Sequence, residues 1–331
     1  MDDNRPQFLP WQADILQRAL NLQHQQHLPH AVLIDSPGEQ DITGFGRYLS
    51  MLLLCDNPSG LSVCTVCEAC RMMQADTYAD FKLVKLEHNE KTKKLNKNIN
   101  IEQIRKLIHE VNLTRQYERM KIALIYPAEA MNKSSANALL KTLEEPAAGA
   151  LIMLVTHNPG HIPVTLRSRC QCWSINPPTR EQALNWLREQ GVEDATATSY
   201  LQFASGDPVL ALELQRNDYA SLVAQFKSSF SQFLRVEVSV SELCRGLLSA
   251  EATIIRRMIN MTLNAYCYQS SGVDADARSR SGADRRSAQA LLDLRRRAQY
   301  QLQVEENNLD LQLQLEDVLI SLKQILSRRL I

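Results

Sequence analysis

The sequence predicts an α/β domain built on a parallel sheet, followed by a small helical domain and an all-helical C-terminal domain. Three mainly apolar runs, at 31–34, 121–126 and 151–156, have the length and continuity of strands buried on both faces. Segments with helical spacing of apolar residues separate these runs, and strands that alternate with helices form parallel sheets. From about residue 219 onward the chain has helical periodicity and little strand signal.

Further elements of the first domain follow from local patterns. Residues 81–86 alternate between apolar and polar like a strand, and residues 101–111 place their apolar side chains on one helical face. Ser134 or Ser135 is expected to cap the next helix, which Pro146 ends. These segments assign residues 1–176 to the α/β domain.

The second domain is predicted to be small and helical, at residues 177–218. It begins after two consecutive prolines at 177–178. A capping box from Thr179 to Gln182 starts its first helix, and Pro208 stands in the first turn of another, where proline is tolerated.

Residues 219–331 are predicted to form a helical domain that mediates oligomerisation. Residues 269–287 are rich in Ser, Gly, Asp and Arg and are interpreted as a mobile loop. Residues 308–315 alternate like a strand, but strong helix formers follow them through Leu330, so the segment is predicted to be helical.

Composition excludes several classes of protein. The chain has 331 residues, of which 44% are hydrophobic and 22% charged, typical of a globular protein of two or three domains. Lys+Arg and Asp+Glu both number 37, whereas a dedicated nucleic-acid binder would carry a basic excess. The polar N-terminus and the absence of an apolar run of about 18 residues argue against a signal peptide and a membrane span. A cytoplasmic location is therefore expected, where thiols stay reduced.

The segment after the first apolar run has the shape of a phosphate-binding loop without its chemistry. Such a loop needs glycines, a Lys for the phosphates and a Ser or Thr for magnesium. Gly38 is the one glycine that remains, Asp41 stands where the Lys belongs, and Ile42 takes the hydroxyl position. Because Asp41 would repel a triphosphate, the sequence predicts a nucleotide-binding fold that does not bind nucleotide.

Four cysteines, Cys55, Cys64, Cys67 and Cys70, predict a structural zinc site within a module at about 55–70. The last three are separated by two residues each, and a turn-rich segment leads from Cys55 to them. Tetrahedral zinc accepts four thiolates, and with all four positions filled the site would be closed to catalysis. Free thiols and an iron–sulfur cluster are the alternatives. The other cysteines, at 170, 172, 244 and 267, are interpreted as core residues.

Together these segments resemble the delta-prime family of bacterial DNA polymerase III clamp-loader subunits, which are AAA+ proteins with a RecA-like sheet domain, a helical lid and a helical collar. The resemblance covers roughly the first half of the chain. It is carried by the four-cysteine insert and by three strings, namely residues 30–34, 135–146 and 165–170.

The resemblance implies elements of an ATP site that this chain lacks. Members that hydrolyse ATP carry an Asp-Glu pair after the strand at 121–125, where the Asp holds magnesium and the Glu orients water. Here these positions are Tyr126 and Pro127. Glu129 comes two residues too late and is interpreted as a surface carboxylate, and Val209 stands where the lid would supply an arginine.

Arg169 is the one functional arginine that the resemblance implies. In this family the arginine of the Ser-Arg-Cys string, residues 168–170 here, points across a subunit interface to a neighbour's ATP. An arginine finger that stabilises the transferred phosphoryl group is worth about 10³–10⁵ in rate. The alternative is a strand-end arginine paired with a carboxylate or a helix C-terminus, a role for which Arg167 is the expected candidate.

The leading hypothesis is therefore a clamp-loader subunit that binds no ATP, supplies Arg169 to a neighbouring ATPase and helps load the sliding clamp on primer–template DNA. Its expected partners are the gamma/tau and delta subunits. No intrinsic ATPase is expected, so it would be classed with DNA polymerase only as a component of the holoenzyme.

Two other functions stay open at this point. An atypical but active ATPase of the gamma/tau type would have to act without the Lys and the Asp-Glu pair. A zinc-dependent nucleic-acid-binding module would be expected to have basic charge and interleaved aromatic residues, which the cysteine insert lacks.

Overall fold

The computed structural model describes residues 8–36, 42–88, 96–117, 119–204, 206–216, 220–235, 237–247 and 311–327, and several short stretches between residues 255 and 298. The chain divides into two compact units, Met1–Gln182 and Ala183–Ile331. Within the described part, no helix is long and apolar enough to cross a membrane.

The first unit contains a parallel sheet, as predicted, and this sheet has five strands. Its strands lie in the order β2-β3-β4-β1-β5. Their bounds are β1 Ala31–Asp35, β2 Phe81–Val84, β3 Lys121–Ile125, β4 Ala150–Thr156 and β5 Gln171–Ser174. Every residue of β3 and β4 is buried, which explains their apolar runs. Because all strands run the same way, the segments after β1, β3 and β4 meet at one edge of the sheet.

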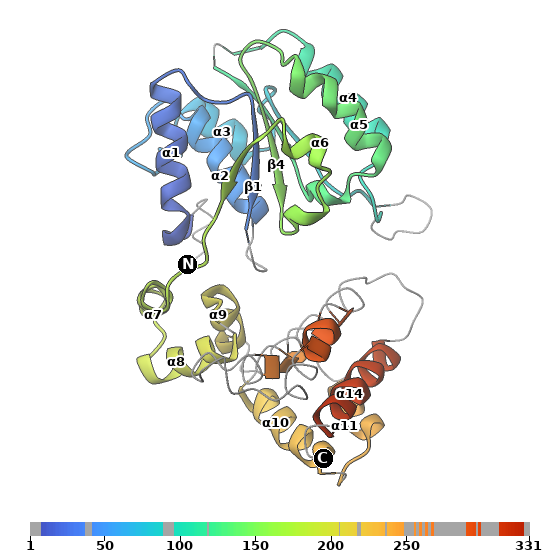
Figure 1. Ribbon diagram of the computed structural model, residues 1–331. Coiled ribbons are helices and arrows are strands. Elements are labelled where there is room, and N and C mark those ends of the chain that lie inside the picture. The colour runs from blue at the N-terminus through green and yellow to red at the C-terminus, as the bar shows by residue number, and fades with distance from the viewer. Residues whose placement is uncertain are drawn as a thin grey trace, which may run out of the picture. The chain divides into compact units, whose positions relative to one another are not determined.

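Helices cover both faces of this sheet. Figure 1 shows α4 and α5 side by side near one face, while α1 and α2 lie toward the other. The helices of this unit are η1 Pro10–Gln12, α1 Ala13–His24, α2 Ile42–Leu54, α3 Glu68–Gln74, α4 Ile101–Asn112, η2 Ala128–Ala130, α5 Lys133–Glu144, η3 Pro159–His161 and α6 Val164–Arg167. Apolar residues of α4 and α5 form one buried cluster with β1, β3 and β4.

The cap of α5 differs from the prediction. Asn132, rather than Ser134 or Ser135, is the N-cap, and its Oδ1 accepts the Ser135 backbone N–H at 2.8 Å. The Ser135 hydroxyl instead donates to the Ile99 carbonyl oxygen at 2.9 Å. The helix therefore begins earlier than expected, because an asparagine side chain caps as well as a serine.

Lys121 is a charged residue at the start of a buried strand and is only 4% exposed. Its ammonium group donates to the carbonyl oxygens of Glu110 and Leu113 at 2.9 and 3.0 Å, and lies 3.6 Å from the Asp80 carboxylate. Asp80 is 1% exposed and also accepts two backbone N–H groups. Burial of both charges is possible because each is paired and hydrogen-bonded.

The secondary-structure elements described in the second unit are all helices. Its helices are α8 Asp194–Phe203, α9 Pro208–Arg216, α10 Ala220–Leu234, α11 Val240–Leu247 and α14 Leu311–Ser327, and α7 Arg180–Glu189 spans the division between the units. The predicted capping box is present, since Thr179 and Gln182 exchange hydrogen bonds at 2.9 and 3.2 Å. The helical interpretation of the alternating segment near residue 311 is confirmed by α14.

One cluster of buried residues joins the helices of the second unit. It contains residues of α7, α8 and α9, such as Leu187 and Leu210, together with residues of α10, α11 and α14, such as Phe230 and Leu319. The separation of a lid at 177–218 from a collar at 219–331 stays a prediction. The predicted loop at 269–287 lies outside the described residues.

Candidate functional site

The edge of the sheet beyond β1, β3 and β4 is where a nucleotide site would lie, since ligands of open parallel sheets bind outside the carboxyl ends of the strands. After β1 the structure describes Ser36, which is 2% exposed, and resumes at Ile42. Gly38 and Asp41 therefore lie outside the described residues. The description of this edge therefore uses the segments that follow β3 and β4.

Two rings occupy the positions after these strands. The Tyr126 and His157 rings pack edge to face, with their centroids 5.9 Å apart and an interplanar angle of 81°. The Ser36 carbonyl oxygen accepts from Nδ1 of His157 at 3.4 Å, which ties the end of β4 to the end of β1. Neither Tyr126 nor Pro127 offers the carboxylate oxygen that magnesium prefers.

Glu129 was expected on the surface, and this interpretation is wrong. It lies in η2 and is half-buried, and its Oε1 accepts from the Asn158 side-chain amide at 3.5 Å. Its Oε2 is buried and has no hydrogen-bond partner among the described residues. Because η2 turns immediately after Pro127, the carboxylate is drawn inward toward β4 instead of facing water.

The four predicted cysteines come together at the end of α2. Cys55 follows α2 directly, Cys67 is the N-cap of α3, and Cys70 lies in its first turn. The four Sγ atoms lie within 4.8 Å of one another, and those of Cys64 and Cys70 are 3.9 Å apart. A tetrahedral zinc ion with Zn–S bonds of about 2.3 Å would hold its sulfurs about 3.8 Å apart. The cluster is therefore compatible with a zinc site.

Backbone hydrogen bonds and burial act on these thiols in opposite directions. The Cys67 N–H donates to the Cys64 sulfur at 3.3 Å and lowers the pKa of Cys64 to about 6. Burial raises the pKa of Cys55 and that of Cys70. A metal ligand must be a thiolate, so the hydrogen bonds to Cys64 favour its ligating form, whereas burial of Cys55 and Cys70 opposes it unless a cation is bound.

The other cysteines follow the prediction only in part. Cys244 and Cys267 are buried, as expected for core residues, and burial raises the pKa of both. Cys170 is half-buried, whereas Cys172 is exposed, so the core interpretation is wrong for Cys172. The reason is that the β5 residues Gln171, Cys172 and Ser174 are exposed, and only Trp173 is buried.

Arg169 lies between α6 and β5 and is paired. Its Nε donates to Oε1 of Glu144 at 2.7 Å, Nη2 donates to the same oxygen, and Nη1 donates to the Thr165 carbonyl oxygen at 2.9 Å. The side chain stays 33% exposed. Arg167, which was expected to take the paired role, is exposed and makes no side-chain hydrogen bond or ion pair with described residues. The chain leaving α6 carries Arg169, not Arg167, over the last residue of α5.

Two residues of these sites were not anticipated. Glu144 is the last residue of α5 and had no assigned role, although a carboxylate in the last helical turn is unfavourable for the helix dipole. His157 follows β4 immediately, and a polar residue directly after a buried strand is the signal that would have found it. Val209, in contrast, lies in the first turn of α9 as expected, where its N–H donates to Asp207 Oδ1 at 2.9 Å.

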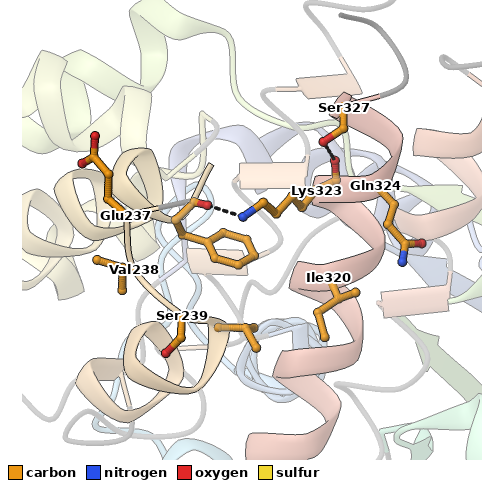
Figure 2. A pocket seen from close by; sticks show the side chains of 9 residues that line it. Glu237, Val238, Ser239, Ile320, Lys323, Gln324 and Ser327 are labelled. Carbon is orange, nitrogen blue, oxygen red and sulfur yellow. Dashed lines mark hydrogen bonds between the residues drawn. The ribbon is translucent and has the colours of Figure 1, made fainter. Parts of the chain in front are cut away.

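A groove with an apolar lining lies on the second unit. It lies between α14 and the segment that joins α10 to α11, and its apolar lining consists of Phe233, Val238, Val240 and Ile320. Figure 2 shows the Lys323 side chain reaching a backbone carbonyl oxygen, which belongs to Phe233 at the end of α10. Ile320 is 41% exposed, and Leu313, seven residues earlier on the same helical face, is 56% exposed.

Comparisons with known proteins give a consistent family. The family model described as DNA polymerase III, delta subunit, matches residues 11–179, just over half of the chain. A protein named DNA polymerase III subunit delta-prime from Pseudomonas aeruginosa is 31% identical over 219 residues, which are 66% of this chain and 65% of that protein. Its namesake from Escherichia coli is 33% identical over 194 residues, or 57% and 55%.

A relative with another name, DNA polymerase III subunit tau from Salmonella typhimurium, is 31% identical over 158 residues. This match covers 48% of this chain and 23% of that protein. The chain thus matches less than two thirds of the length of each of these three relatives.

Proposed function

The chain belongs to the DNA polymerase III delta-prime family, and we propose that it is a clamp-loader subunit that does not itself bind ATP. The observation that carries the proposal is the edge of the sheet, where the Tyr126 and His157 rings pack together and no Asp-Glu pair follows β3. The substitution of Asp41 for the phosphate-binding Lys supports the same conclusion from the sequence. A chain that lacks these residues would act in the complex as a scaffold rather than as an ATPase.

Within an AAA+ ring the subunit would act on a neighbour's site. Arg169 would point to the ATP of an adjacent gamma/tau subunit, while the delta subunit and the sliding clamp would be further partners of the complex. The free edge of the Arg169 guanidinium and its partial exposure support this role. The ring would then open the clamp and close it on primer–template DNA.

A purified mixing assay tests the proposal. The ATPase and delta subunits are combined with and without the full chain, and assembly, DNA-stimulated ATP hydrolysis and clamp loading are measured. The chain should enter the complex and raise turnover without hydrolysing ATP alone. Size measurement that finds the chain always free of these partners would favour the zinc-dependent nucleic-acid-binding module instead.

The cysteine cluster would hold one structural zinc ion through Cys55, Cys64, Cys67 and Cys70. The ion would supply a cross-link between the end of α2 and the start of α3, in addition to the Arg47 side chain of α2, which donates to the Met73 carbonyl oxygen of α3 at 2.9 Å. Sulfur separations below 4.8 Å support a single ion, because a cluster of several iron atoms would hold its cysteines farther apart.

Titration calorimetry of the isolated chain with Mg·ATP should give no binding heat up to about 1 mM nucleotide, equivalent to a binding free energy weaker than about −4 kcal/mol. The reason is that Asp41 repels the phosphates and that Tyr126 cannot hold the metal. A gamma/tau ATPase subunit titrated in parallel is the positive control. A micromolar dissociation constant for this chain, about −8 kcal/mol, would favour the active gamma/tau-type ATPase.

The collar should be sensitive to charge in the groove of the second unit. Ile320→Asp is expected to weaken association with partner subunits about tenfold or more, because it places a carboxylate on an apolar stripe that a neighbouring helix would cover. The melting temperature should change little, since Ile320 is already exposed. Leu113→Asp, at a 53% exposed leucine of the first unit, is the matched control and should assemble normally. Sedimentation analysis that finds equal assembly for both variants would place the interface elsewhere.

A further inference from the structure

The Arg169 guanidinium is held from two sides, and two of its N–H groups have no partner among the described residues. Of its five N–H groups, three are engaged, two by Oε1 of Glu144 and one by the Thr165 carbonyl oxygen. The remaining two N–H groups belong to Nη1 and Nη2, and a phosphate oxygen accepts hydrogen bonds from such groups. The contacts therefore fix the side chain without consuming its capacity to bind an anion.

Glu144 has no favourable role in its own helix. It is the last residue of α5, where the helix dipole favours a cation, so a carboxylate there costs stability unless a cation neutralises it. Glu145, the next residue, has the same charge and no side-chain hydrogen bond or ion pair within the described part of the chain. Of these two neighbouring carboxylates, Glu144 is the one that contacts Arg169.

We propose that Glu144 is a positioning residue for Arg169. The proposal rests on the function proposed above, in which Arg169 reaches a neighbour's ATP. A free arginine side chain carries about 2 kcal/mol of rotamer entropy, which must be lost when its guanidinium engages the transferred phosphoryl group. Glu144 and the Thr165 carbonyl oxygen restrict that freedom beforehand, and such preorganisation acts on the transition state rather than on nucleotide binding.

The test uses the assembled complex, with ATPase subunits whose own finger arginines are replaced, so that turnover depends on the site beside this chain. Glu144→Gln keeps the size of the side chain and removes its charge. It should lower kcat for ATP about two- to fivefold, the range expected for an exposed ion pair, and leave KM unchanged. Glu145→Gln makes the same change one residue away and should behave as the unaltered complex.

A double substitution separates positioning from a structural role. If Glu144 acts through Arg169, Glu144→Gln should cause no further loss in an Arg169→Ala chain, because interacting residues are not additive. Equal losses in both backgrounds, a kcat equal to that of Glu145→Gln, or a raised kcat would each overturn the proposal. Arg169→Ala without any effect would instead refute the finger function itself, so the two failures are distinguishable.

Discussion

Replacing Cys67 with serine is expected to abolish zinc binding and to loosen residues 55–74 while the five-stranded sheet stays folded. Cys67 supplies a sulfur to the cluster and caps α3 by accepting the Cys70 N–H at 3.4 Å, so one substitution removes both contributions. Structural zinc contributes on the order of 10 kcal/mol to the folding of isolated zinc-finger peptides. The zinc content found by metal analysis should fall from about one ion per chain to near zero. The melting temperature should fall by about 5 °C or more.

Cys172→Ser is the matched control, because Cys172 is exposed and distant in sequence from the cluster. It should keep its zinc and its stability. Hydrogen exchange should then show faster exchange of α3 in the Cys67 variant, and unchanged protection of β3 and β4 in both. A wild-type chain purified without chelators that contains no zinc would contradict the metal assignment, as would a Cys67→Ser chain that retains zinc fully.

The sheet could be predicted because its central strands are buried on both faces, which forces continuous apolar runs such as 151–156. The edge strand β5 carries a weaker signal, since three of its four residues are exposed and only Trp173 is buried, and this is why the prediction that Cys172 lies in the core is wrong. Helix caps were predictable to within a few residues. The choice of Asn132 over the following serines depends on the hydrogen bond of Ser135 to Ile99, which is a tertiary contact.

Some features of the candidate sites depend on residues that are close in sequence and could be predicted. Others depend on contacts between residues that are far apart in sequence and could not. Two-residue spacing predicts the cysteine cluster, because the ligands are close in sequence. The missing carboxylates at Tyr126 and Pro127 follow from their place after a strand. The pairing of Arg169 with Glu144 joins residues 25 positions apart and depends on how α6 lies against α5. Sequence patterns do not contain that geometry, so the paired role was assigned to the wrong arginine.

Arg169→Ala is expected to leave folding and assembly intact and to reduce DNA-stimulated ATP hydrolysis and clamp loading by the complex. Loss of an arginine finger lowers turnover at the affected site by about 10³-fold or more in well-studied systems. Other ATP sites of the ring keep their own arginine fingers. The steady-state rate of the complex should therefore fall by the fraction of total turnover that the site beside this chain contributes. The exposed pair with Glu144 contributes at most about 1 kcal/mol, so stability should change little.

Arg167→Ala is the control that the structure provides for this prediction. Arg167 lies two residues away, is exposed and has no side-chain partner among the described residues, so its removal should change stability by less than about 0.5 kcal/mol and leave turnover unchanged. Pre-steady-state measurement of ATP hydrolysis should separate the one slow site from the remaining ones in the Arg169 complex. If both variants load clamps and hydrolyse ATP as the unaltered complex does, Arg169 is a surface arginine whose task is to neutralise Glu144 at the end of α5.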